Sequence, residues 1–178
     1  MNTSVLDPIA SFLGPWSVSI NIWSILFRLF LSVILSAIIG CERSSKRHSA
    51  GLRTFILVSL ASTIAMMLDV FIGYSEVVEF PLISASTIVA SAIISVNSIL
   101  FSSRNQIKGL TTSVGLWACG IIGLTAGAGY YTVTLISFLA LLCSLSLFPT
   151  FETYLKNRSN HFEVHLELVN STYLQNFV

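Results

Sequence analysis

Five mostly apolar runs, each about as long as a helix that crosses a bilayer, constrain this chain more than any other feature. They cover about residues 19–41, 53–72, 81–101, 110–128 and 130–148. A helix needs about 20 apolar residues to span the hydrocarbon core of a membrane. Only 10% of the residues are charged, against about 25% in ordinary soluble domains. We therefore expect an all-α integral membrane protein with about five transmembrane helices.

The loops between these runs differ in charge, and this predicts the orientation. Basic residues are retained on the cytoplasmic side of a membrane. The loop between the second and third runs contains Glu76 and Glu79 and no Lys or Arg. The loops after the first and third runs contain Arg43, Lys46, Arg47, Arg53, Arg104 and Lys108. The sequence thus predicts an N-terminus outside and a C-terminus in the cytoplasm.

The runs also divide the chain into three parts. Residues 1–18 are expected to form an N-terminal interfacial segment, residues 19–149 the transmembrane domain, and residues 150–178 a short cytoplasmic tail. In the tail, polar and apolar residues alternate strictly over residues 161–168, which favours a β-strand. Two interpretations of the polar side chains in this strand are a metal site and the polar face of an amphipathic strand. We predict no metal or cofactor. The net charge of +1 gives no reason to expect nucleic-acid binding.

Two charged residues fall inside predicted spans. Arg28 lies about nine residues into the first run, and Asp69 lies at a comparable level of the second. Charges at such depth are costly and usually face the protein interior, a partner or water. One hypothesis is an ion pair between Arg28 and Asp69. The other interpretation is that Arg28 extends to the outer interface.

Small and hydroxylated residues recur at helical spacing on three of the runs. Such a face can line a hydrated path for an ion, or it can let helices approach closely and hydrogen-bond across the contact. We favour packing. The third run has Ser84, Thr87, Ser91, Ser95 and Ser98, the first has Ser32, Ser36 and Gly40, and the fourth has Gly123 and Gly127.

A denser group of polar residues is predicted at the cytoplasmic ends of the spans. Such a rim can bind an ion or a partner loop, or it can form a structural network that fixes the helix ends. The rim candidates are Glu42, Arg43, Arg53, Thr54, Thr111 and Thr112.

These rim residues also carry a family resemblance. Residues 40–43 (GCER), 50–54 (AGLRT) and 109–112 (GLTT), with Gly123, Gly127 and Gly129, resemble the MgtC/SapB family in order and spacing over about residues 26–131. The resemblance implies a bacterial inner-membrane protein linked to magnesium homeostasis and virulence. It also implies a regulator of other membrane proteins rather than an enzyme. By position it marks Arg28 and the rim candidates as functional residues.

The chain also departs from the family pattern. The family's glycine-rich third helix is replaced here by residues 91–97 (SAIISVN), and only about thirty residues follow Phe148, where many members continue into an ACT-like domain. We therefore expect a divergent member that contacts lipid and forms a homo-oligomer or a hetero-oligomer, for example with a full-length paralogue. The other hypothesis is a subunit of a small-ion transporter or channel. No catalytic arrangement is evident, because all three histidines lie outside the predicted spans.

Overall fold

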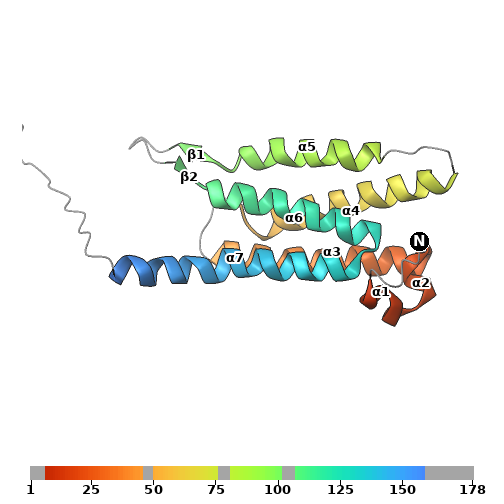
Figure 1. The fold of residues 1–178 in the computed structure, drawn as a ribbon. Coiled ribbons are helices and arrows are strands. Elements are labelled where there is room, and N and C mark those ends of the chain that lie inside the picture. Colours follow the sequence, from red (N-terminus) through yellow and green to blue (C-terminus); the bar gives the residue numbers. More distant parts are fainter. Residues whose placement is uncertain (1–6, 46–49, 76–80, 102–106, 159–178) are drawn as a thin grey trace, which may run out of the picture.

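The computed structural model describes residues 7–45, 50–75, 81–101 and 107–158. The helices run side by side in a bundle, and the short helices α1 and α2 lie at one end of it (Figure 1). The elements are α1 (Pro8–Leu13), α2 (Pro15–Val18), α3 (Ile22–Ser45), α4 (Leu52–Ser75), α5 (Leu82–Val96), β1 (Leu100–Phe101), β2 (Ile107–Lys108), α6 (Leu110–Ala128) and α7 (Tyr131–Arg158).

The expected all-α membrane fold is confirmed. Among the described helices, α3, α4, α6 and α7 are long and apolar enough to cross a membrane, and α5 is a shorter apolar helix. The bounds of α6 coincide with the predicted run 110–128, because Gly109 and Gly129 flank it with left-handed backbone at φ +89° and +84°. Glycine adopts this conformation without the steric cost that other residues incur.

Helix α5, which corresponds to the third predicted run, is shorter than the predicted range 81–101. It has 15 residues and ends at Val96. The next residues form a turn, in which the amides of Asn97 and Ser98 donate to Ile94 and Ser95. The chain then enters β1, which pairs antiparallel with β2. Apolar composition alone did not reveal this ending, because strand and helix residues here are equally apolar.

The N-terminal interfacial segment is also helical where it is described. Asp7 accepts a hydrogen bond from the amide of Ala10 and so caps α1. Gly14, at φ +92°, separates α1 from α2. Proline begins both helices, at Pro8 and Pro15, where its missing N–H is not needed.

Helix α6 forms the centre of the bundle and packs most extensively against α4. A Cβ atom built at Gly127 would lie 2.5 Å from the carbonyl oxygen of Thr63, and one at Gly123 would overlap the carbonyl oxygen of Ser59. The two glycines therefore let the backbones of α4 and α6 touch, as the spacing predicted. Apolar packing continues towards α3 and α7 through Ile39, Phe55, Leu116, Phe138 and Leu145.

Helix α7 does not end at Phe148 as predicted. It continues through Pro149 to Arg158, so the predicted domain boundary between residues 149 and 150 falls inside a helix. The predicted strand over residues 161–168 lies outside the described residues.

Candidate functional site

The guanidinium of Arg28 is buried at the end of the bundle that holds α1 and α2, which we call the Arg28 end. The residue is 1% exposed. Its Nη1 donates to the carbonyl of Gly127 at 2.7 Å, and its Nη2 donates to the carbonyls of Ser17 at 3.0 Å and Val18 at 3.2 Å. Nε donates to the hydroxyl of Tyr131 at 3.4 Å. Arg28 therefore faces the protein interior, at the level where the span of α7 begins.

Three of the four acceptors of Arg28 are carbonyls at helix C-termini. The amides of Gly129 and Tyr130 donate to the carbonyls of Ala126 and Thr125, and the guanidinium of Arg28 donates to the carbonyl of Gly127. Ser17 and Val18 end α2. A cation is favoured at a helix C-terminus, where the helix dipole is negative. Arg28 thus joins α2, α3 and α6 electrostatically.

The hypothesis of an Arg28–Asp69 ion pair is wrong. The carboxylate of Asp69 accepts hydrogen bonds from the amides of Ile83 at 3.0 Å and Ser84 at 2.5 Å. These are the first free amides of α5, which has no side-chain cap of its own at Pro81. Because α5 packs against α4, the N-terminal amides of α5 bind the carboxylate of Asp69, for which we had expected Arg28 as the partner.

Between the two ends of the bundle, α3 contributes a seam of buried polar side chains, namely Ser24, Arg28, Ser32, Ser36 and Arg43, each at most 2% exposed. At its middle, the Ser32 and Ser59 hydroxyls lie 2.8 Å apart, and the Thr63 hydroxyl donates to Ser32 at 2.8 Å. Thr63 also lies 2.9 Å from the Gly123 carbonyl. The seam therefore joins α3, α4 and α6 by hydrogen bonds.

In the predicted hydroxyl stripe of the third run, the residues Ser84, Ser91 and Ser95 are buried in the bundle. All five hydroxyls of the stripe donate to a carbonyl three or four residues earlier in α5 or at its start. The carbonyl of Ser95 also accepts from the hydroxyl of Ser113 on α6 at 2.7 Å. This pattern is that of helix packing.

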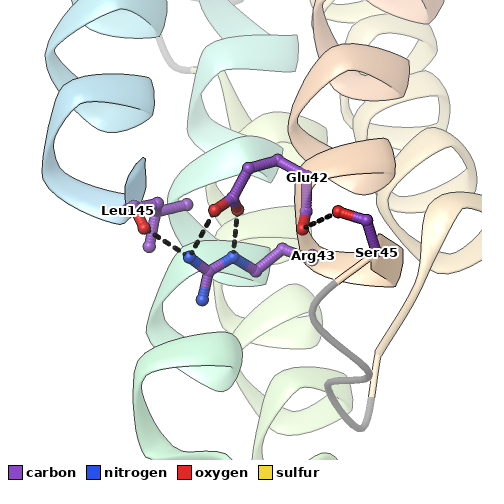
Figure 2. Close-up of polar contacts among 4 residues, drawn as sticks. All are labelled: Glu42, Arg43, Ser45 and Leu145. Carbon is purple, nitrogen blue, oxygen red and sulfur yellow. Dashed lines mark hydrogen bonds and ion pairs between the residues drawn. The ribbon is translucent and has the colours of Figure 1, made fainter. Parts of the chain in front are cut away.

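At the opposite end, which we call the Arg43 end, Glu42 and Arg43 form an ion pair. Nε of Arg43 lies 2.6 Å from Oε2 of Glu42. Arg43 is 2% exposed, and its Nη2 donates to the carbonyl of Leu145 on α7 at 2.6 Å. Figure 2 shows the guanidinium between the Glu42 carboxylate and this carbonyl. The pair therefore ties the end of α3 to α7.

The carbonyl of Leu145 is available because of Pro149. In a regular helix it would accept from the amide of residue 149, but proline has no N–H. Arg43 supplies the missing donor. This contact also explains why α7 passes through a proline without ending.

The other rim candidates do not join this pair in one network. Arg53, Thr54 and Thr111 are exposed, and the hydroxyl of Thr54 donates to its own loop at Gly51. Thr112 is 1% exposed, and its hydroxyl has no hydrogen-bond partner. Among the residues that the structure describes, no three His, Cys, Asp or Glu side chains are placed to hold a metal ion.

Sequence reasoning missed several residues of this arrangement. Ser59, Ser62 and Thr63 are all buried, and their spacing on one helical face was a usable signal. Asp7, in the expected N-terminal interfacial segment, accepts hydrogen bonds from the amide and hydroxyl of Thr132 at the start of α7. Backbone carbonyl acceptors such as Leu145 and Gly127 have no side-chain signal.

Comparison with known proteins gives consistent matches. The model of the MgtC family matches residues 29–154. YhiD of Escherichia coli strain K12, named "Putative magnesium transporter YhiD", is 30% identical over 82% of this chain and 69% of its own length. SapB of Bacillus subtilis strain 168 is 31% identical over 70% of this chain and 56% of its own. MgtC of Salmonella typhimurium strain LT2 is 25% identical over 67% of this chain and 50% of its own. No solved structure matches the chain.

Proposed function

Because the chain belongs to the MgtC family, a family of bacterial membrane proteins, we propose that it is a non-enzymatic regulatory or accessory subunit of the inner membrane. It acts by contacting other membrane proteins, in magnesium or ion homeostasis or in virulence. The magnesium link rests on the name of YhiD and on the family.

The observation that carries this proposal is the part of α7 beyond Leu145, whose apolar side chains the described residues leave exposed; we call it the free end of α7. Arg43, near the end of α3, contacts Leu145, and α7 continues for 13 residues beyond that level. At 1.5 Å per residue, this end extends roughly 20 Å past the rim. In Figure 1, α7 runs beyond the other helices at this end. Phe148, Phe151, Tyr154 and Leu155 are each more than 60% exposed on it.

Phe148, Phe151 and Leu155 are three and four residues apart and Tyr154 adjoins Leu155, so the four lie towards one side of the helix. A helix that starts at the membrane boundary with Tyr131 crosses the hydrocarbon core in about 20 residues. Counted from Tyr131, the twentieth residue is Thr150, so the turns of α7 that carry Phe151, Tyr154 and Leu155 lie at or beyond the boundary of the hydrocarbon core. An apolar face outside the hydrocarbon core is typical of a protein-contact surface.

The buried seam supports a scaffold more than a conduit. The hydroxyls of Ser32, Ser59 and Thr63 bind each other and backbone carbonyls. An ion that entered would have to displace these bonds without water to replace them.

The second candidate function is a subunit of a small-ion transporter or channel. The name of YhiD favours it, as do the buried cations Arg28 and Arg43 at the two ends of one polar seam. Flux measurements in proteoliposomes under gradients of magnesium, potassium, protons and phosphate separate the two. Flux above that of empty liposomes would favour transport.

The test of the leading proposal is affinity purification from native membranes with quantitative proteomics. Phe151→Glu places a charge on the free end of α7, and Leu139→Ala changes an exposed residue of the same helix inside the span. We expect a membrane protein that copurifies with the wild type and with Leu139→Ala but is lost with Phe151→Glu. Recovery of the wild type with only itself or lipid would contradict the proposal.

A further inference from the structure

A cavity of about 460 Å³ lies at the Arg28 end, between the α1–α2 segment, α4 and the turn from α6 to α7. Val18, Met66, Val70 and Tyr130 form much of its apolar wall. The volume is within the roughly 300–1,000 Å³ that is usual for small-molecule sites. The span of α4 ends at Gly73 and that of α7 begins at Tyr131. The cavity therefore lies at the membrane boundary, where lipid headgroups are found.

Asp7 is one of the residues that line this cavity, and the residue is only 4% exposed. Its Oδ1 accepts from the amide of Ala10 and from the amide and hydroxyl of Thr132. Among residues 7–45, 50–75, 81–101 and 107–158, the hydrogen bond found to Oδ2 is a long one, from the amide of Thr132 at 3.3 Å. A carboxylate oxygen has about two acceptor positions, so Oδ2 retains acceptor capacity.

No cationic side chain of the described residues neutralises Asp7, because the one ion pair found among them joins Glu42 and Arg43. Burial raises the pKa of Asp7, but the hydrogen bonds from Thr132 and Ala10 outweigh it and leave that pKa below its usual value. Asp7 is therefore ionised at neutral pH, and the start of α7 stabilises its charge.

A positive charge lies behind another wall of the same cavity. Gly129 lines the cavity, and a Cβ atom built there would lie 2.7 Å from Nη2 of Arg28. The guanidinium therefore lies next to Gly129, behind this wall of the cavity. The cavity thus presents a carboxylate on one side and a buried cation behind another, which complements a ligand with an ammonium and a phosphate group.

We propose that this cavity binds the headgroup of a zwitterionic aminophospholipid. The primary ammonium donates to Oδ2 of Asp7, the phosphate lies on the Gly129 side towards Arg28, and the acyl chains pass Met66 and Val70 into the bilayer. Phosphatidylglycerol lacks the ammonium. Phosphatidylcholine keeps the positive charge but has no N–H to donate.

The test is native mass spectrometry of the full chain, released from nanodiscs that contain dioleoyl phosphatidylethanolamine, phosphatidylglycerol or phosphatidylcholine. We expect phosphatidylethanolamine to be retained about tenfold more than either other lipid, the scale of one charge-assisted hydrogen bond. Free phosphoethanolamine should not displace it, because it has no acyl chains. Equal retention of the three lipids, or displacement by free phosphoethanolamine, would overturn the proposal.

Two variants locate the site. Asp7→Asn removes the charge, and Val70→Trp fills the cavity while leaving Asp7 in place. Each should lower phosphatidylethanolamine retention about tenfold. Asp69→Asn is the matched control, since Asp69 caps α5 and does not line the cavity, and it should retain the lipid. A thermal melt confirms that each variant is folded. If Asp7→Asn does not fold, Val70→Trp decides, and unchanged retention in Val70→Trp contradicts the proposal.

Discussion

Replacement of Arg28 by alanine should strongly destabilise the protein. Two of its acceptors, the carbonyls of Val18 and Gly127, would lose the donor that the structure gives them. The carbonyl of Gly127 is buried, and leaving it unpaired costs about 1–3 kcal/mol. The carbonyl of Val18 is only partly buried and costs less, and the lost packing of the arginine stem adds to the total. Relief from burying a charge offsets part of the loss. We therefore expect a net loss of about 3–5 kcal/mol, as when a buried charge network is broken.

The assay is thermal unfolding in detergent, followed by circular dichroism. For a chain of this size, 1 kcal/mol shifts Tm by about 2–4 °C, so Arg28→Ala should lower Tm by about 6–20 °C. Arg28→Lys should lose less stability than Arg28→Ala, because it keeps the charge. It should still be less stable than the wild type, because lysine lacks the planar fork of donors. Arg53→Ala is the control, since Arg53 is exposed, and should change stability by less than about 0.5 kcal/mol. Equal Tm losses for Arg28→Ala and Arg53→Ala would refute a buried, carbonyl-bound guanidinium.

Three further predictions follow from the packing and charges. Gly123→Ala should cost about 1–3 kcal/mol, because its Cβ would overlap the α4 backbone, whereas Gly73→Ala in open space should be neutral or slightly stabilising in the same melts. Because the pKa of Asp7 is lowered on folding, its stabilisation is complete above the ordinary pKa of about 3.8 and is lost as pH falls further. The Tm of the wild type should therefore drop more steeply than that of Asp7→Asn below about pH 4, and parallel curves would contradict this. A double-mutant cycle on Glu42 and Arg43 should give a coupling energy of about 1 kcal/mol or more, and additive losses would argue against the ion pair.

The sequence predicted those parts of the fold that depend on apolar length and small residues. The bounds of α6 were predicted in full, since glycines mark both of its ends. The close contact of Gly123 and Gly127 with α4 was likewise expected from their spacing. The end of α5 was not predicted, because a two-residue strand that follows a turn has no distinct apolar pattern.

The candidate site was predicted as a set of residues but not as a set of contacts. The importance of Arg28 was visible from its depth, yet its partners are carbonyls, which any residue supplies. Asp69 was paired with the wrong charge because the sequence does not show that the start of α5 needs a cap. The fifth span was predicted to end at Phe148, but α7 continues through Pro149, where Arg43 on another helix supplies the donor that the proline lacks.

Site-specific photo-crosslinking in native membranes tests the central claim, that the protein acts through contacts of the free end of α7. A photoreactive residue placed at Tyr154 lies on the exposed face beyond the rim, and one at Leu139 lies on the exposed surface inside the span. The account predicts one discrete membrane-protein adduct from position 154 and lipid adducts alone from position 139. Lipid or self-adducts alone from both positions would contradict it.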